Sequence, residues 1–365
     1  MWGGLPADFS VTGFCGRGNA YGVSSLPYPV VRLACSADLR LVDFAEKLFR
    51  GRIFQMYGLE RRLAGFDIAH VAEPYYAYAL QAVRAKRLNP RLKVVVTAWD
   101  TSMGRFDIPS IGNFFLGKRS KRIIAEVVRD ADLFLPVSGA AAAVLRSYGV
   151  PDGKMRVFPP AVVSGASVSD GSALRSRLGI AAGAYYLAVN RLVVEKGVYG
   201  ILSAWKIFMS TPAGKGKKLL MVGAGPEEAG LMSRAAEYGI ADSVVFAGVL
   251  PHDEVRSLYA GACALVLASI WTPSWQEQFG YVLAEAIIAG CPVVGTRSGS
   301  IPEVAGDAGI IVPPEDPDAL SDAFARVIDP ETRAVLLRNG EARKPAFSAE
   351  RFVQGLIGSY RLVIS

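Results

Sequence analysis

Two glutamates eight residues apart lie at the start of one apolar segment. Glu277 is followed by Gln-Phe-Gly-Tyr-Val-Leu-Ala and then by Glu285. Gly280 and the Gly-Cys-Pro at 290–292 predict a short buried helix over 282–289 that ends before a strand. The N-terminus of a helix presents unpaired amides and the positive end of a dipole, which favour a diphosphate. The pattern therefore predicts an anion-binding site with a carboxylate on either side.

The separation of the two glutamates fits a ligand that carries hydroxyl groups on both sides of a diphosphate. Eight residues of helix span about 12 Å, at about 1.5 Å per residue. One glutamate then reaches hydroxyls on one side of the diphosphate and the other reaches those on the far side, which is the shape of a nucleotide-sugar. Two glutamates at this spacing also occur on the solvated face of an ordinary amphipathic helix, so the surrounding residues decide between the two interpretations.

The surrounding residues resemble the signature of retaining glycosyltransferase family 4. Segment 190–198 is similar to the Gly-Arg-Leu…Lys-Gly loop of that family, and segment 221–226 is similar to its Val-Gly-x-Gly-Pro turn. The resemblance covers most of residues 90–330. The positions that carry it around the two glutamates are Glu277, Phe279, Gly280, Glu285, Ala289, Gly290, 292–294 and 301–304.

The resemblance implies a fold and a set of site residues. The fold is α/β of the GT-B type, with two Rossmann-like domains whose parallel sheets face a central cleft. The implied activity is transfer of a sugar from a nucleotide-diphosphate-sugar to a glycan or lipid-linked acceptor, with retention of configuration and without a metal or another cofactor. The implied catalytic residues are Glu277, Arg191 and Lys196, and the implied donor-binding residues are Glu285, Phe279, Gly280, Tyr281, Gly223, Gly225, Leu250 and Trp99.

Each implied role has a physical reason. Arg191 and Lys196 can balance the charge of a departing diphosphate without a metal, because a guanidinium and an ammonium both pair with phosphate oxygens. By resemblance, Glu285 holds the ribose hydroxyls, Glu277 holds the hydroxyls of the donor sugar, and the amides at 279–281 face the diphosphate. An arginine and a lysine in a loop are otherwise usually solvated.

The composition predicts the same class of fold. The chain has 365 residues, of which 51% are hydrophobic and 20% charged, enough for two packed domains. Short apolar runs, such as those at 93–97 and 133–137, alternate with helical stretches, which predicts parallel sheets covered on both faces. We expect an N-terminal domain at 1–163, a nucleotide-sugar-binding domain at 164–340, and at 341–365 a terminal helix with Phe352, Leu356, Ile357 and Tyr360 on its apolar side, which by analogy crosses back to the first domain.

The first domain departs from the family pattern in two places. Trp99 stands where many members have a histidine that faces the donor sugar, and an indole can stack on a sugar ring but cannot transfer a proton. The first strand, glycine loop and helix of the family look shortened, because Gly3 and Gly4 are followed almost directly by segment 9–13. Such shortening would weaken the acceptor side, or the true start lies upstream. His70 is interpreted as structural, and His252 as a surface residue at a helix start.

The basic charge lies in the N-terminal half. Residues 1–160 carry 22 Lys and Arg against 13 Asp and Glu, a net charge of +9, and the remainder carries −2. Aromatic and aliphatic residues precede the basic run at 118–122, so segment 106–122 is a candidate contact with an anionic membrane surface. A solvated helix face explains it equally well. Nucleic acid is not expected, because no binding module accompanies the basic clusters.

Several other features are expected to be absent. No apolar run reaches the ~18 residues of a membrane span, and no export signal is found, which places the chain in the cytoplasm, with peripheral membrane contact at most. The four cysteines lack metal-ligand spacing and are expected to be reduced. The Asp-x-Asp at 130–132 and that at 316–318 resemble a metal motif of another glycosyltransferase fold, but both lie at expected helix or turn boundaries, and no lysine motif for pyridoxal phosphate is found.

A second class of function stays open at this stage. A non-catalytic protein that binds a nucleotide-sugar and serves as a scaffold or partner of another transferase would explain the shortened first unit and the tryptophan at position 99. The presence of Arg191, Lys196, Glu277 and Glu285 favours the enzyme.

Overall fold

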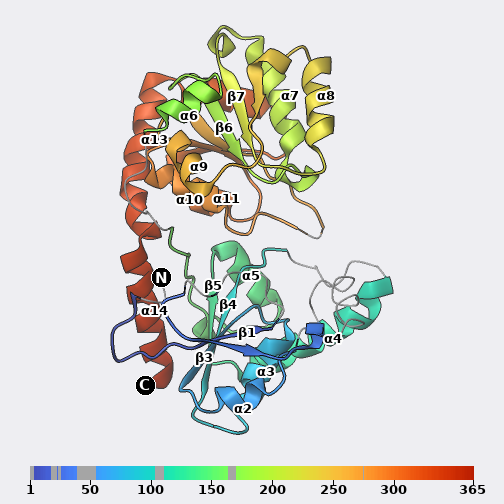
Figure 1. Ribbon diagram of the computed structural model, residues 1–365, viewed down its shortest axis with the longest axis vertical. Helices are drawn as coiled ribbons and strands as arrows, with labels where there is room; N and C mark the ends of the chain where they lie inside the picture. The colour runs from blue at the N-terminus through green and yellow to red at the C-terminus, as the bar shows by residue number, and fades with distance from the viewer. Residues whose placement is uncertain are drawn as a thin grey trace. The chain divides into compact units, whose positions relative to one another are not determined.

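The computed structural model describes residues 4–17, 23, 26–38, 55–102, 111–162, 170–273 and 275–365, with the backbone alone at 37 and 111–118. The chain divides into two compact units (Figure 1). The first unit combines Met1–Ala161 with Ala349–Ser365, and the second unit is Val162–Ser348. Both are built from parallel strands and helices, so the predicted α/β fold is confirmed.

The second unit is built on one sheet of six parallel strands. Its order is β11-β10-β9-β6-β7-β8, so the chain starts in the middle and adds strands on both sides. Most residues of the four central strands are buried, as expected for short apolar runs in a sheet covered on both faces. The strands are β6 (Tyr185–Val189), β7 (Lys218–Val222), β8 (Val244–Phe246), β9 (Ala264–Leu267), β10 (Val293–Thr296) and β11 (Gly309–Val312).

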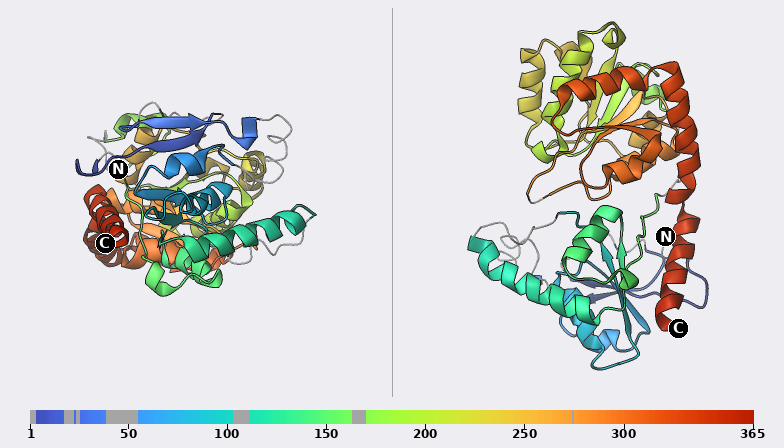
Figure 2. Two further views of the ribbon diagram at one scale, coloured as in Figure 1. Left: turned by 90° about the horizontal axis from the view of Figure 1, so that it is seen from below. Right: turned by 180° about the vertical axis from the view of Figure 1, so that it is seen from behind.

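Helices cover this sheet on both sides (Figures 1 and 2). One face carries an aromatic core in which Tyr186 of β6 packs against Trp205 at 5.4 Å and Phe324 at 5.1 Å between ring centroids. This core packs the helices that carry Trp205 and Phe324 against the sheet. The helices of the unit are α6 (Ser172–Arg177), α7 (Val198–Met209), α8 (Glu228–Glu237), α9 (His252–Tyr259), α10 (Tyr281–Ile288), α11 (Ile301–Ala305), α12 (Pro317–Val327) and α13 (Pro330–Arg343).

The first unit holds two smaller groups of parallel strands. β3 (Ile68–Ala72), β4 (Lys93–Ala98) and β5 (Leu133–Pro136) form one sheet, and β1 (Gly13–Gly16) pairs with β2 (Val30–Leu33). The β1–β2 pair stands where the sequence predicted a shortened first unit. The helices are α2 (Leu59–Leu63), α3 (Ala77–Ala85), α4 (Ile111–Asp130), α5 (Gly139–Ser147) and α14 (Ala349–Ile364).

Helix α14 packs along the β3–β5 sheet of the first unit (Figures 1 and 2). Its apolar face is buried, as the sequence predicted, with Phe352, Leu356, Ile357 and Tyr360 all 9% exposed or less. Phe352 packs against Phe158 at 4.8 Å between ring centroids. The helix is thus part of the first unit's core, although nearly 190 residues separate it from the rest of that unit.

Two expectations about surfaces and thiols can be compared with the structure. Within the described ranges, no helix is long and apolar enough to cross a membrane. All four cysteines are free thiols, as expected. Residues 103–110 and the side chains of 111–118 lie outside what the structure describes, so the membrane-contact segment 106–122 stays a prediction.

Candidate functional site

Lys196 and Glu277 form a buried ion pair. Lys196 Nζ lies 2.7 Å from Glu277 Oε2, and the two side chains are 15% and 8% exposed. The residues are 81 positions apart in sequence and come from the loops that follow β6 and β9. Two of the three predicted catalytic residues therefore meet, and each is the counter-ion of the other.

Backbone contacts fix the loop that carries Lys196. Lys196 ends a short 3₁₀ helix, Val194–Lys196, and Gly197 follows with φ 66°. A Cβ at Gly197 would lie 1.9 Å from the carbonyl oxygen of Ala268, so only glycine allows the loops after β6 and β9 to come this close. The Ile270 amide also donates to the Glu195 carbonyl at 3.0 Å. The close contact sets the position of the Lys196 stem.

Two neighbours of the ion pair were missed by the sequence analysis. The Ser269 hydroxyl donates to Glu277 Oε2 at 2.7 Å, and the Trp275 ring lies 4.6 Å from Lys196 Nζ. A cation over an indole face is attracted by its quadrupole. Both residues lie in the loop before α10, and their proximity to Glu277 in the chain was the available signal.

Glu285, the second glutamate of the motif, is held by two donors. His252 Nε2 lies 3.0 Å from Oε1, and the Tyr259 hydroxyl donates to Oε2 at 2.7 Å. Tyr259 is 1% exposed, and burial together with the nearby Glu285 carboxylate raises the pKa of its hydroxyl far above the usual range, so the hydroxyl stays a donor. His252 begins α9 and is exposed, as predicted, but its contact with Glu285 was not foreseen.

Helix α10 starts between the two glutamates. Gly280 is its N-cap with φ 77°, a left-handed conformation that glycine adopts without strain. Phe279 is buried and packs edge-on against Tyr281 at 5.3 Å between ring centroids. Tyr281, 40% exposed, follows as the first helical residue. The backbone amides that are predicted to bind the diphosphate therefore lie at the start of α10. The buried Phe279 ring fixes the chain just before this helix.

The glycines after β7 fit against the loop that carries Arg191. A Cβ at Gly223 would lie 1.9 Å from the Asn190 carbonyl oxygen, and one at Gly225 would lie 2.2 Å from that of Leu192. The Leu192 amide donates to the Ala224 carbonyl at 3.0 Å. The structure shows that these glycines let a neighbouring loop approach. The approach of their backbone to a nucleotide stays a prediction.

The structure also shows the surroundings of three further predicted site residues. Arg191 is exposed and pairs with Glu195 at 3.4 Å, a contact worth little in water. Leu250 lies in the loop between β8 and α9, next to the exposed Val249. Trp99 belongs to the first unit, where its amide donates to Glu73 Oε1 at 2.9 Å.

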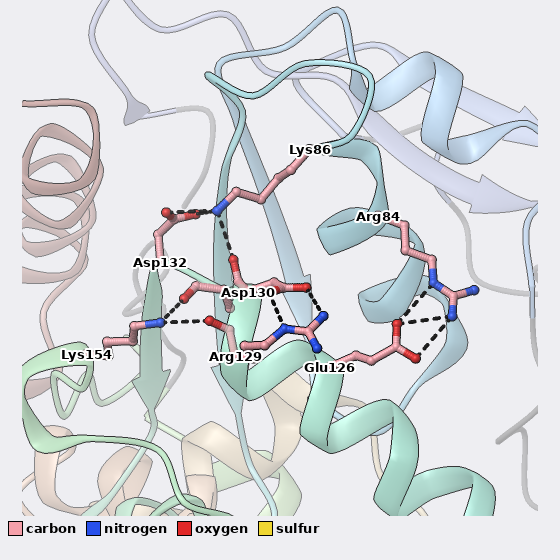
Figure 3. Close-up of polar contacts among 8 residues, drawn as sticks. Arg84, Lys86, Glu126, Arg129, Asp130, Asp132 and Lys154 are labelled. Atoms are coloured by element: carbon pink, nitrogen blue, oxygen red, sulfur yellow. Dashed lines mark hydrogen bonds and ion pairs between the residues drawn. The ribbon is translucent and has the colours of Figure 1, made fainter.

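The aspartates at 130 and 132 have structural partners (Figure 3). Arg129 Nε lies 2.7 Å from Asp130, and this hydrogen bond holds the pKa of the Asp130 carboxyl below its usual range. Lys86 Nζ lies 2.9 Å from Asp132, which also accepts the Val94 amide. Asp316 caps α12 by accepting the Ala319 amide at 2.9 Å. Among the residues that the structure describes, no cluster of ligating side chains could hold a metal ion.

Family comparison agrees with the fold and with the residues of the motif. The profile described as "Glycosyl transferases group 1" matches residues 174–343, and the one described as "Glycosyltransferase Family 4" matches residues 28–164. Together they cover both units. The chain therefore belongs to the family 4, group 1 glycosyltransferases, and the predicted family is confirmed.

Individual relatives and solved structures share 19–32% of their sequence with this chain. The chain is 32% identical over 275 residues to D-inositol 3-phosphate glycosyltransferase of Acidothermus cellulolyticus, which covers 72% of this chain and 59% of that protein. The chain spans 56–59% of the length of this and two further curated relatives. A crystal structure of Anabaena Alr3699/HepE in complex with UDP superposes with a TM-score of 0.71 at 19% identity, covering 91% of this chain and 86% of that chain. Sucrose-phosphate synthase from Thermosynechococcus elongatus superposes with a TM-score of 0.69 at 21% identity, covering 96% and 88%. These likenesses confirm the GT-B fold.

Proposed function

We propose that this chain is a metal-independent, retaining hexosyltransferase that moves a sugar from a nucleoside-diphosphate-sugar to a glycan or lipid-linked acceptor. The observation that carries the proposal is the Lys196–Glu277 ion pair. Glu277 lies just before Gly280, the N-cap of α10, and Glu285 lies within that helix. An ammonium, a helix N-terminus and two fixed carboxylates are the groups that an anionic leaving group and two sets of hydroxyls require.

In this scheme the second unit binds the donor. Lys196, Arg191 and the amides at 279–281 stabilise the diphosphate as it departs, which lowers the barrier to breaking the bond to the sugar. Glu277 accepts hydrogen bonds from hydroxyls of the donor sugar, and Glu285 accepts those of the ribose. The acceptor hydroxyl attacks the anomeric carbon from the face that the diphosphate leaves, as the bond from that carbon to the diphosphate oxygen breaks. The hydroxyl proton passes to the departing diphosphate, and the configuration is retained. Holding both reactants in place supplies much of the acceleration.

Relatives and neighbours support a nucleotide-sugar donor. One solved neighbour is described in complex with UDP-glucose, and one curated relative is described as O-antigen chain mannosyltransferase B of Escherichia coli. A glycan or lipid-linked acceptor is consistent with the basic first unit. The segment 106–122 is then the proposed contact with an anionic membrane surface.

The first experiment is a thermal-shift screen of the full chain against UDP, GDP, ADP and their common sugar conjugates, with and without EDTA. We expect a stabilisation that is selective for one base and insensitive to chelation. Transfer assays with the selected donor then detect product, and its anomeric configuration tests retention. Binding without transfer to any acceptor would favour the alternative, a nucleotide-sugar-binding scaffold, and absence of any shift would contradict both.

Lys196 has the clearest expected variant. Lys196→Ala should weaken binding of the selected nucleoside diphosphate by about 10- to 100-fold, since a hydrogen bond to a charged group contributes about 1.5–3 kcal/mol. Arg191→Ala should weaken it less, because Arg191 is exposed. Isothermal titration of both variants measures the difference, and equal affinities to the unsubstituted chain would contradict the proposed diphosphate site.

A further inference from the structure

The carboxylate of Glu285 has both of its oxygens occupied by donors from one neighbouring helix. His252 Nε2 lies 3.0 Å from Oε1 and the Tyr259 hydroxyl lies 2.7 Å from Oε2. The two donors are the first and the last residue of α9, while Glu285 lies in the second turn of α10. Two side chains of α9 therefore hydrogen-bond to one side chain of α10.

The two donors have different surroundings. Tyr259 is buried, and it approaches the carboxylate from the protein interior. His252 has a side chain that is 62% exposed, whereas that of Glu285 is 15% exposed. The Glu285 carboxylate is held by a buried donor and by an exposed donor, so it cannot rotate freely. It still has lone pairs that can accept further hydrogen bonds.

We propose that His252 and Tyr259 are positioning residues that fix the Glu285 carboxylate to receive the ribose hydroxyls of the donor, and so make the site selective for ribonucleotides over deoxyribonucleotides. This inference rests on the proposed function, which places the ribose at Glu285. A fixed acceptor strengthens each hydroxyl contact, because less side-chain freedom is lost when the ligand binds.

The structure offers a simpler explanation, in which the two contacts only tie α9 to α10. That explanation predicts a loss of stability, with every ligand affected alike. The proposal instead predicts an effect that depends on the ribose hydroxyls of the ligand. A thermodynamic cycle between a side chain and a ligand hydroxyl separates the two explanations.

The experiment measures the affinity of the full chain for UDP, GDP and ADP, and for the 2′-deoxy and 3′-deoxy analogues of whichever binds. For the unsubstituted chain, we expect each missing hydroxyl to weaken binding by about tenfold or more. His252→Ala and Tyr259→Phe should each weaken binding of the ribonucleotide by about three- to tenfold, and change that of the deoxynucleotides less than twofold. His252→Gln, which keeps a donor, should restore most of the affinity.

Steady-state kinetics supply a second measurement. In transfer assays, His252→Ala should raise KM for the donor by a similar factor and leave kcat nearly unchanged, because the ribose is remote from the reacting bond. Asp253→Ala is the matched control, since Asp253 is the next residue of α9 and its side chain is 90% exposed and pairs with Arg256. It should change neither affinity nor KM.

The outcomes separate the inference from the function on which it rests. If the unsubstituted chain binds a nucleoside diphosphate, and the variants then bind ribo- and deoxyribonucleotides with equal loss or with no loss, the positioning role is wrong and the proposed function stands. If the unsubstituted chain binds no nucleoside diphosphate, both are wrong. His252 is exposed, so His252→Ala is expected to fold even if Tyr259→Phe does not.

Discussion

At the scale of single residues, the main finding is that two expected catalytic groups neutralise each other. Lys196 and Glu277 lie 2.7 Å apart and are largely buried, so neither charge is free for a ligand without a rearrangement. A diphosphate that binds Lys196 must compete with the Glu277 carboxylate. In the proposed scheme, the pair keeps the ammonium in place before the donor arrives, at a cost to the affinity for the nucleotide portion.

This competition leads to a prediction about Glu277→Gln. The variant should bind the selected nucleoside diphosphate about three- to tenfold more tightly, because Lys196 loses its internal counter-ion and a buried, unpaired ammonium favours an incoming anion. Transfer should fall by about 100-fold or more, since the carboxylate that is proposed to hold the donor sugar is lost. Isothermal titration and a transfer assay measure the two effects.

Lys196→Met is the control for this prediction. The double variant, Lys196→Met with Glu277→Gln, removes both the ammonium and the carboxylate that is proposed to compete with the diphosphate for it. The double variant should bind the nucleotide as weakly as Lys196→Met alone. Weaker or unchanged nucleotide binding by Glu277→Gln would show that the ion pair does not oppose the diphosphate.

The sequence supplied the charged residues of the site but not their contacts. Glu277, Glu285 and Lys196 were chosen by their place in motifs. The ion pair joins positions 81 apart, and the strand order that brings β6 next to β9 is not visible in any local pattern. The sequence indicates a surface residue at a helix start for His252, and only the packing of α9 on α10 brings it to Glu285.

At the scale of elements, the loops after β6, β7 and β9 lock together through glycines. Gly197 lies against the Ala268 carbonyl, and Gly223 against that of Asn190. Backbone contacts of this kind leave no adjustable side chain between the loops. The position of these loops is therefore set by strand order and by the lack of a Cβ at the glycines, more than by the side chains of the proposed site.

Gly197→Ala tests this locking. The added Cβ would lie 1.9 Å from a carbonyl oxygen, and φ is already 66°. Left-handed backbone costs an alanine about 1–2 kcal/mol, and overpacking adds about 1–3 kcal/mol. Scanning calorimetry should show a drop in Tm of about 6–12 °C, with a loss of nucleotide affinity because Lys196 is displaced.

Gly239→Ala is the matched control. Gly239 has φ 69°, but nothing lies within 4 Å of the position of its Cβ, so only the backbone cost of about 1–2 kcal/mol applies. Nucleotide affinity should not change. Equal destabilisation in both variants would mean that the close approach at Gly197 relaxes without strain.

The elements themselves were largely predictable. Helix α10 was expected at 282–289 and spans Tyr281–Ile288, and the apolar runs at 93–97 and 133–137 correspond to β4 and β5. The β1–β2 pair could not be derived, because Val30–Leu33 is short and follows a segment rich in glycine, serine and proline residues that is typical of loops. Periodicity indicates which face of an element is apolar. It gives neither the order of strands in a sheet nor the pairing of two strands that stand apart from it.

At the scale of the whole molecule, the first unit depends on a helix from the end of the chain. Tyr360 of α14 lies 2.7 Å from His70 Nδ1, and His70 Nε2 lies 2.6 Å from the Thr97 hydroxyl. The imidazole thus joins β3, β4 and α14. Burial lowers the pKa of His70 from 6.5 to about 4, so the ring is neutral at physiological pH. This agrees with the structural role that the sequence suggested.

The lowered pKa of His70 predicts an acid-sensitive first unit. The unfolded chain binds a proton below pH 6.5, whereas the folded state resists it until about pH 4. The stabilisation of the folded state that comes from the neutral His70 ring is therefore complete above pH 6.5, and it is lost as the pH falls towards 4. From pH 7.5 to 5, the free energy of unfolding should drop by about 2 kcal/mol more than in His70→Gln, as measured by urea titration.

Tyr360→Phe separates the hydrogen bond from the titration. It should lower the free energy of unfolding by about 1 kcal/mol at both pH values and keep the pH dependence. A His70→Gln variant with the same pH dependence as the unsubstituted chain would show that His70 does not cause the acid sensitivity.

The first unit consists of two separate segments of the chain, and this affects the order in which the two units can fold during synthesis. Met1–Ala161 emerges first, but its core stays incomplete until Ala349–Ser365 has been synthesised. At about 5–20 residues per second, the nearly 190 intervening residues take about 10–40 s. The second unit, Val162–Ser348, is continuous and can fold before the first, so, of the two units, the one whose synthesis starts earlier is completed later.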